Sequence, residues 1–190
     1  QLKIESSIVM PSTTPSIKVD AVKKLGSKVI LYGDTYDDAY KFAINYSRTN
    51  KYDFVHPYDD LDVIAGQGTI AIELLDQMSQ HPDYVFVPVG GGGLLAGISV
   101  YLKTINPRIK IIAVEAEDSA CFNLAYKNAK PIALKHVGIF ADGVAVKKIG
   151  TKTFKLTKNL IDYSLTVSTD EICSSIKDLY DETRIIAEPA

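Results

Sequence analysis

The residues that point most clearly to a chemical role in this chain of 190 residues are four consecutive glycines, Gly90 to Gly93. They stand between an apolar segment, 84–89, and an apolar helical pattern that begins at Leu94. Glycine loses more conformational entropy on ordering than any other residue, so four in succession indicate a special demand on the backbone. The backbone N–H groups of such a loop, at the positive end of the next helix, can hold an anion that no side chain keeps away. The run therefore predicts a phosphate-binding loop.

The spacing alone leaves two kinds of phosphate ligand open. Gly91-x-Gly93-x-x-Ala96 fits the dinucleotide fingerprint, and Glu115 follows about 20 residues later, where a ribose-binding acid would lie. This reading predicts an NAD-binding Rossmann oxidoreductase. The other ligand is a small phosphate-bearing cofactor such as pyridoxal phosphate, which predicts an amino-acid lyase or racemase. A P-loop is excluded because no Lys-Ser or Lys-Thr pair follows the glycines.

The elements that must position this loop alternate between strands and helices. Expected strands cover 4–10, 29–32, 84–89, 109–115 and 165–167, with helical patterns between most of them. This order predicts an α/β fold with open, mostly parallel sheets and flanking helices. The continuous apolar run 84–89 is of the type that is buried on both faces of a parallel sheet. Turn residues and a proline within 51–60 predict a domain boundary, which separates 1–55 from 56–190.

Capping signals predict where two helices begin. Ser12, Thr13 and Thr14 offer N-cap hydroxyls ahead of Pro15, which suits the first turn of a helix. Ser168-x-x-Glu171 is a capping-box signature and predicts a helix that reaches about residue 184. Residues 140–150 are expected to form a loop.

Composition limits the classes of protein to which the chain can belong. Lys and Arg number 21 against 23 Asp and Glu, a net charge of −2, which does not suit the concentrated basic face that nucleic acids require. No apolar run approaches the ~20 residues that span a bilayer, and the first residues carry no signal-peptide pattern. Cys121 and Cys173 form neither a disulfide framework nor a zinc-type pair. We therefore expect a cytoplasmic protein without nucleic-acid or membrane partners.

Several further segments resemble one enzyme family. PVGGGGLLAG, IVMPSTTPSIKVDAV, IAGQGTIAIELL, IIAVEAEDSAC, FADGVAVKKIG and AEPA resemble, in family order, the serine/threonine dehydratase group of fold type II pyridoxal-phosphate enzymes. VEAEDSAC together with GVAVKKIG is similar to the biosynthetic threonine dehydratases (threonine deaminases) in particular. The resemblance covers essentially the whole chain and favours pyridoxal 5'-phosphate over a dinucleotide. It implies the fold shared with the tryptophan synthase β chain.

The resemblance also implies a reaction, a metabolic pathway, an oligomeric state and two incomplete domains. The activity is that of an ammonia-lyase converting threonine to 2-oxobutanoate and ammonia in isoleucine biosynthesis, in a homo-oligomer, a tetramer or dimer. Residues 1–55 would be part of a small domain and 56–190 part of the large cofactor-binding domain, both incomplete. The family's Schiff-base lysine stands in a Ser/Thr-x-Lys-x-Arg string that does not occur here. We therefore expect a central fragment that is inactive alone; a non-catalytic truncated homologue is the alternative.

Residue by residue, the resemblance implies a set of cofactor contacts. Gly90 to Gly93 and Leu94 would donate backbone N–H groups to the cofactor phosphate, Gly143 would lie beside the pyridine ring, and Glu188 would approach the cofactor. Some relatives bind a divalent cation through an acid six residues after the equivalent of Glu115, but this chain has Cys121 there. Because hard cations prefer oxygen ligands, we expect no metal site and interpret Cys121 as a small buried residue.

Overall fold

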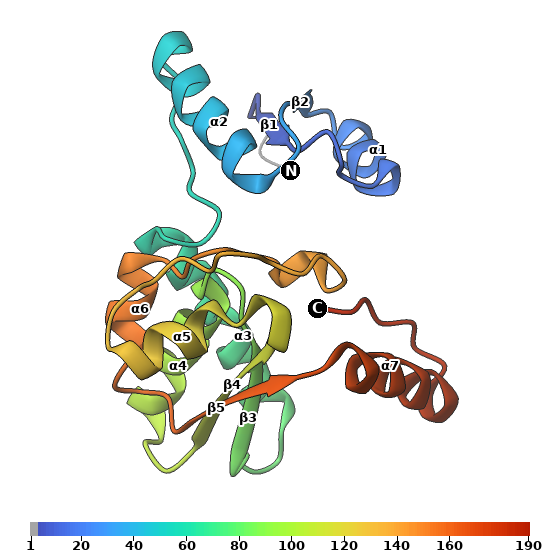
Figure 1. The fold of residues 1–190 in the computed structure, drawn as a ribbon. Helices are drawn as coiled ribbons and strands as arrows, with labels where there is room; N and C mark the ends of the chain where they lie inside the picture. Colours follow the sequence, from blue (N-terminus) through green and yellow to red (C-terminus); the bar gives the residue numbers. More distant parts are fainter. Residues whose placement is uncertain (1–3) are drawn as a thin grey trace. The chain divides into compact units, whose positions relative to one another are not determined.

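The computed structural model describes residues 4–190, and the chain divides into two compact units, Gln1–Val55 and His56–Ala190 (Figure 1). The first unit contains β1 (Ser7–Met10), α1 (Ser16–Lys24), β2 (Lys28–Leu31) and α2 (Tyr36–Asn50). The second contains, in order, α3 (Leu61–Gln77), β3 (Tyr84–Pro88), α4 (Gly93–Ile105), β4 (Lys110–Ala116), η1 (Glu117–Ser119), α5 (Cys121–Asn128), η2 (Asp142–Val144), α6 (Thr151–Thr157), β5 (Tyr163–Val167) and α7 (Thr169–Thr183). In the described part of the chain, no helix combines the length and the apolar character needed to cross a membrane.

In the first unit, β1 and β2 pair in parallel, and α1 connects them. The predicted hydroxyl cap of α1 is wrong: Pro15 is itself the N-cap, with a non-helical backbone (ψ 137°), and no side chain caps the helix. The Thr13 hydroxyl is oriented elsewhere and donates to the Asp34 carbonyl at 3.1 Å. By contrast, α2 begins at a complete capping box formed by Thr35 and Asp38.

In the second unit, β3, β4 and β5 form one parallel sheet in the order β3-β4-β5. The register pairs Phe86 with Ile112, and Ile112 with Tyr163. Parallel neighbours joined through helices confirm the predicted α/β class. The capping-box prediction for the last helix is also confirmed, since Ser168 and Glu171 cap α7 reciprocally.

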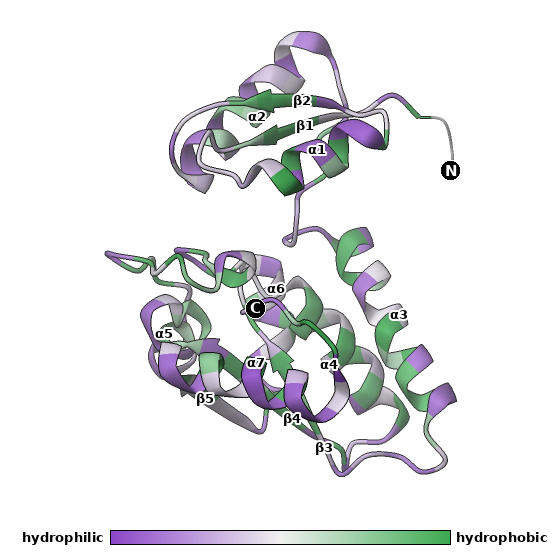
Figure 2. Cartoon of the chain, turned by 90° about the vertical axis from the view of Figure 1, so that its right-hand side faces the viewer, coloured by the Kyte–Doolittle hydropathy of each residue, from purple (hydrophilic) through white to green (hydrophobic). Residues whose placement is uncertain are grey.

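The prediction that strand β3 is buried on both faces is wrong for the described residues. Val87 and Val89 lie in the core with Leu95, but Tyr84 and Phe86, on the other face, are 59% and 63% exposed. Among the described helices, α4 covers β3 on the face that carries Val87. Figure 2 shows that α4 is mostly hydrophobic. The apolar sequence of β3 therefore does not show whether other elements cover both faces of the strand.

Helices α3 and α4 approach closely enough to fix the position of α4. A Cβ atom added at Gly68 would lie 3.2 Å from the Gly97 carbonyl oxygen, and one added at Gly97 would overlap the backbone of α3. Such contact requires glycine, because any larger residue would push the helices apart. The N-terminus of α4, where the glycine loop ends, is thereby held against α3.

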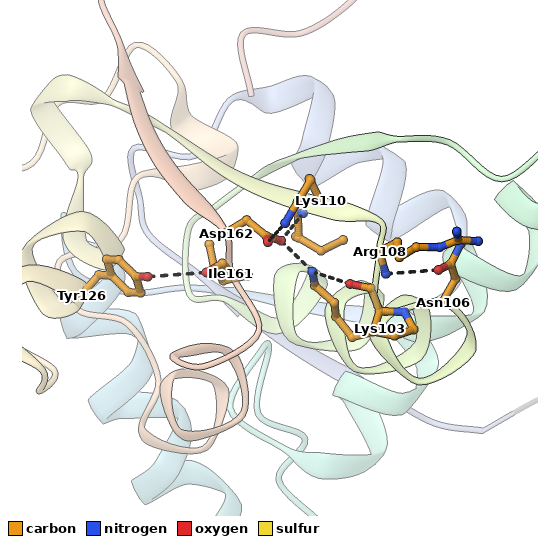
Figure 3. Close-up of polar contacts among 9 residues, drawn as sticks. Lys103, Asn106, Arg108, Lys110, Tyr126, Ile161 and Asp162 are labelled. Atoms are coloured by element: carbon orange, nitrogen blue, oxygen red, sulfur yellow. Dashed lines mark hydrogen bonds and ion pairs between the residues drawn. The ribbon is translucent and has the colours of Figure 1, made fainter.

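The opposite end of the sheet is tied together by Asp162, which precedes β5 (Figure 3). Its carboxylate accepts hydrogen bonds from Lys103 Nζ (2.7 Å), Lys110 Nζ (3.0 Å) and the Ile111 N–H (2.9 Å). Partial desolvation opposes ionisation, but these donors outweigh it and lower the pKa of Asp162 to about 2. Because Lys110 begins β4, this cluster lies at the end of the sheet remote from the glycines.

Candidate functional site

The glycine loop connects the end of β3 directly to the first turn of α4. Gly92 is the N-cap of α4, with a left-handed backbone (φ 89°) that favours glycine, and no side chain caps the helix. The first N–H of this turn with an acceptor in the described chain is that of Ala96, which donates to the Gly92 carbonyl at 2.9 Å. The preceding N–H groups stand at the positive end of a 13-residue helix. They provide the donors that an anion requires.

The surface around this loop has no room for side chains on the glycines. A Cβ atom at Gly91 would overlap the ring of Tyr58, and one at Gly93 would lie 3.1 Å from the Tyr58 Cβ. Leu94 is half-buried and packs its side chain against the core, so that only its backbone remains for the loop. A larger residue at these positions would therefore collide with neighbouring protein atoms, so the loop presents its backbone alone.

Gly143 and Glu188 lie together, and their neighbours reach the glycine loop. A Cβ atom at Gly143, in η2, would lie 3.3 Å from Glu188 Oε1 and 2.9 Å from the Ala190 Cβ. A Cβ atom at Gly90 would lie 3.0 Å from the Cα of Val144, which follows Gly143. The structure thus brings together three segments that are far apart in the sequence. Their contacts with a cofactor stay a prediction.

Glu115 is placed where it cannot serve a ribose. It is 2% exposed, and its two oxygens accept hydrogen bonds from the backbone N–H groups of Phe122 and Asn123, both at 2.7 Å. Burial raises its pKa to about 7, although the two backbone donors act in the opposite direction. The carboxylate connects the end of β4 to the start of α5. The interpretation of Glu115 as a ribose-binding acid is therefore wrong.

Cys121, the first residue of α5, is fully buried, as expected for a small core residue. Burial, together with the nearby Glu115 carboxylate, raises the pKa of its thiol to about 12. Its Sγ donates to the Gly90 carbonyl at 3.4 Å. Within residues 4–190, no group of three His, Cys, Asp or Glu side chains is arranged to hold a metal ion; that the protein binds no metal stays a prediction.

Sequence reasoning missed a second group of contacts with the loop, made by Asp59 and helix α6. The Asp59 carboxylate accepts from the N–H groups of Thr151 (3.0 Å), Lys152 (2.8 Å) and Thr153 (3.1 Å). Thr153 Oγ1 in turn donates to the Gly91 carbonyl at 2.9 Å. More than 90 residues separate Asp59 from α6, so no local pattern in the sequence could have connected them.

Comparison with known proteins finds relatives that are named threonine dehydratase or threonine deaminase. The protein named L-threonine dehydratase biosynthetic IlvA from Haemophilus influenzae is 50% identical over 190 residues, which are 100% of this chain and 37% of the relative. Threonine dehydratase biosynthetic, chloroplastic, from Arabidopsis thaliana is 48% identical over 183 residues, 96% of this chain and 31% of the relative. The solved processed form of threonine deaminase isoform 2 from Solanum lycopersicum matches with a TM-score of 0.93 and 45% identity, over 99% of this chain and 55% of that chain.

The chain thus spans 31–37% of the length of these two curated relatives. A family model described as pyridoxal-phosphate dependent enzyme matches residues 1–190. The dinucleotide alternative fails for two reasons. The carboxylate of Glu115 already accepts a backbone hydrogen bond within the fold, and the matching family model is that of pyridoxal-phosphate dependent enzymes. This chain belongs to the family of pyridoxal-phosphate dependent enzymes.

Proposed function

We propose that the protein carrying this chain is a pyridoxal-phosphate-dependent ammonia-lyase that converts threonine to 2-oxobutanoate and ammonia. The observation that carries the proposal is the run of four glycines at the start of α4, where no side chain caps the helix. It occurs in a chain half identical to a protein named biosynthetic threonine dehydratase. The glycine loop supports the choice of cofactor, and the sequence identity supports the choice of substrate.

The residues present fit the phosphate of the cofactor. The backbone N–H groups of Gly90 to Gly93 and Leu94 bind it, at the positive end of α4. A phosphate dianion needs several donors at close range, and a loop without Cβ atoms allows that approach. The overlap with Tyr58 that a Cβ at Gly91 would cause shows how little space the loop leaves for anything except backbone.

Gly143 and Glu188 complete the surface next to the phosphate loop. Gly143 offers bare backbone to the pyridine ring, and Glu188 places an exposed carboxylate beside it. When bound, pyridoxal phosphate delocalises the charge left by removal of the α-proton, which allows the β-hydroxyl group to leave. This chain binds and orients the cofactor. Residues 1–190 contain no Ser/Thr-x-Lys-x-Arg string, so the chain does not catalyse alone.

The test uses the full-length protein that contains these residues, loaded with pyridoxal phosphate and mixed with threonine. We expect 2-oxobutanoate and ammonia in equal amounts, and no product from residues 1–190 alone. A protein that binds pyridoxal phosphate but releases no 2-oxobutanoate would refute the substrate. A protein that binds NAD and not pyridoxal phosphate would refute the cofactor role of the loop.

We further propose that the enzyme works in isoleucine biosynthesis, as a cytoplasmic homo-oligomer, either a tetramer or a dimer. The word biosynthetic in the names of its relatives supports the first part. The plant relative is named chloroplastic, so fractionation of the source cells tests the cytoplasmic location. Sedimentation of the full-length protein tests the oligomer, which a monomer at micromolar concentration would contradict.

A further inference from the structure

The carbonyl group of Gly91, in the middle of the glycine loop, is held by two donors. The Thr153 hydroxyl donates to it at 2.9 Å, and the Gly150 N–H donates to it at 3.2 Å. Both donors come from the start of α6, about 60 residues later in the sequence than Gly91. The neighbouring Gly90 carbonyl accepts from Cys121 Sγ at 3.4 Å. Two successive carbonyls of the loop are therefore fixed by groups from other elements.

Fixing a carbonyl also fixes the N–H of the same peptide group. The described backbone contains no cis peptide bond, and in a planar trans peptide the carbonyl and the following N–H point in opposite directions. The N–H of Gly92 therefore points away from Thr153, and the N–H of Gly91 points away from Cys121. Glycine peptides rotate easily, so without these contacts the loop could turn a carbonyl toward an anion.

Thr153 is itself held firmly. It is fully buried, and its N–H is one of the three bound by the Asp59 carboxylate at the start of α6. Its hydroxyl also lies 3.1 Å from the Gly150 carbonyl, so one proton is shared between two acceptors, with Gly91 the nearer. A Cβ atom at Gly92 would lie 3.0 Å from this hydroxyl oxygen. The hydroxyl therefore packs directly on the loop.

We propose that Thr153, held in place by Asp59, is a positioning residue that sets the orientation of the Gly91–Gly92 peptide for phosphate binding. The proposal rests on the proposed function of the loop. Thr153 does not touch the phosphate and acts through the carbonyl of Gly91. Thr153 thus differs from a threonine that only packs in the core. Loss of such a threonine would lower stability but would not change the preference for pyridoxal phosphate over pyridoxal.

The same helix supplies a matched control. Thr157 is also fully buried, one turn after Thr153, and its hydroxyl donates within α6, to the carbonyls of Thr153 (2.9 Å) and Phe154 (3.4 Å). Thr157→Val therefore makes the same chemical change in the same helix without touching the loop. Thr153→Ser keeps the hydroxyl and removes only a methyl group.

The experiment measures the dissociation constants of pyridoxal phosphate and of pyridoxal, which lacks the phosphate, for the full-length protein and the three variants. We expect Thr153→Val to weaken binding of pyridoxal phosphate about tenfold, since one oriented hydrogen bond is lost. Binding of pyridoxal should stay within about twofold of wild type, as should binding of both ligands to Thr153→Ser and Thr157→Val. Thermal unfolding of each variant reports its folding.

Several results would overturn the proposal. Unchanged binding of pyridoxal phosphate to Thr153→Val would do so, as would an equal loss for Thr153→Val and Thr157→Val. An equal loss for pyridoxal and pyridoxal phosphate would show general loosening of the site. If the wild-type protein binds pyridoxal phosphate but forms no 2-oxobutanoate, the proposed reaction fails while this inference stands. If it binds no pyridoxal phosphate, both fail.

Discussion

Replacing Glu115 with glutamine should change the stability of the protein in a pH-dependent way. The side chain is almost completely buried and joins β4 to α5 through hydrogen bonds from the Phe122 and Asn123 N–H groups. A glutamine can accept one of these bonds, but its NH₂ group then faces the other N–H. Leaving a buried donor unpaired costs about 1–3 kcal/mol. At low pH, where the buried acid is neutral, Glu115→Gln should therefore be the less stable protein.

The magnitude of the pH effect follows from the pKa of Glu115. Burial raises that pKa from 4.5 to about 7 in the folded state, and the difference corresponds to about 3 kcal/mol. Because the folded state holds the proton more tightly, this stability is fully present below pH 4.5. It is lost as the pH rises from 4.5 to about 7 and is absent above that range. The advantage of wild type over Glu115→Gln should thus shrink across this range and approach zero or change sign.

The assay is urea unfolding of both proteins at a series of pH values between 4.5 and 8, with the free energies of unfolding compared at each pH. Glu117→Gln, which removes an exposed carboxylate two residues later, controls for the change in net charge. A difference between wild type and Glu115→Gln that stays constant with pH would refute the reasoning. A difference that grows with pH would show that the two N–H donors outweigh burial and keep Glu115 ionised.

Three other substitutions and one control, Gly66→Ala, test the site and the contacts that support it. Gly91→Ala should weaken binding of pyridoxal phosphate more than tenfold, because its Cβ would overlap Tyr58. Gly66→Ala, where a Cβ would meet nothing within 4 Å, should leave binding of pyridoxal phosphate unchanged. Asp162→Asn should lower the free energy of unfolding at pH 7 by about 1–2 kcal/mol, allowing for solvent screening. That loss should fade as the pH falls from 3.8 toward 2, as urea unfolding would show. Asp59→Ala should lower the thermal midpoint, by the loss of about 1–2 kcal/mol of helix capping.

Local signals in the sequence predicted much of the second unit. The capping box of Ser168 and Glu171 places the start of α7, and the apolar helical pattern that begins at Leu94 matches the start of α4 at Gly93. These predictions succeed because caps and apolar periodicity act within a few residues of the backbone. The glycine run likewise lies where predicted, between a strand and a helix, since both neighbouring patterns are strong.

Contacts between distant residues could not be predicted in the same way. Helix α6 is short, seven residues, and it is capped by Asp59 from outside its own sequence. The crossing of Gly68 and Gly97 depends on the packing of two whole helices. The exposed face of β3 shows the same limit, because a continuous apolar run reports what a strand can bury and not what covers it. Tertiary packing decides all three.

The ambiguity between a dinucleotide and pyridoxal phosphate has a specific structural origin. Both kinds of site use glycines at the start of a helix, so Gly91 and Gly93 cannot distinguish them. The acid after the next strand should do so, and Glu115 stands at the expected distance. After β4, however, the chain turns through η1 into α5 and brings the Phe122 and Asn123 N–H groups onto that carboxylate. The direction of the chain after the strand, and not the identity of the acid, thus makes Glu115 unavailable to a ribose.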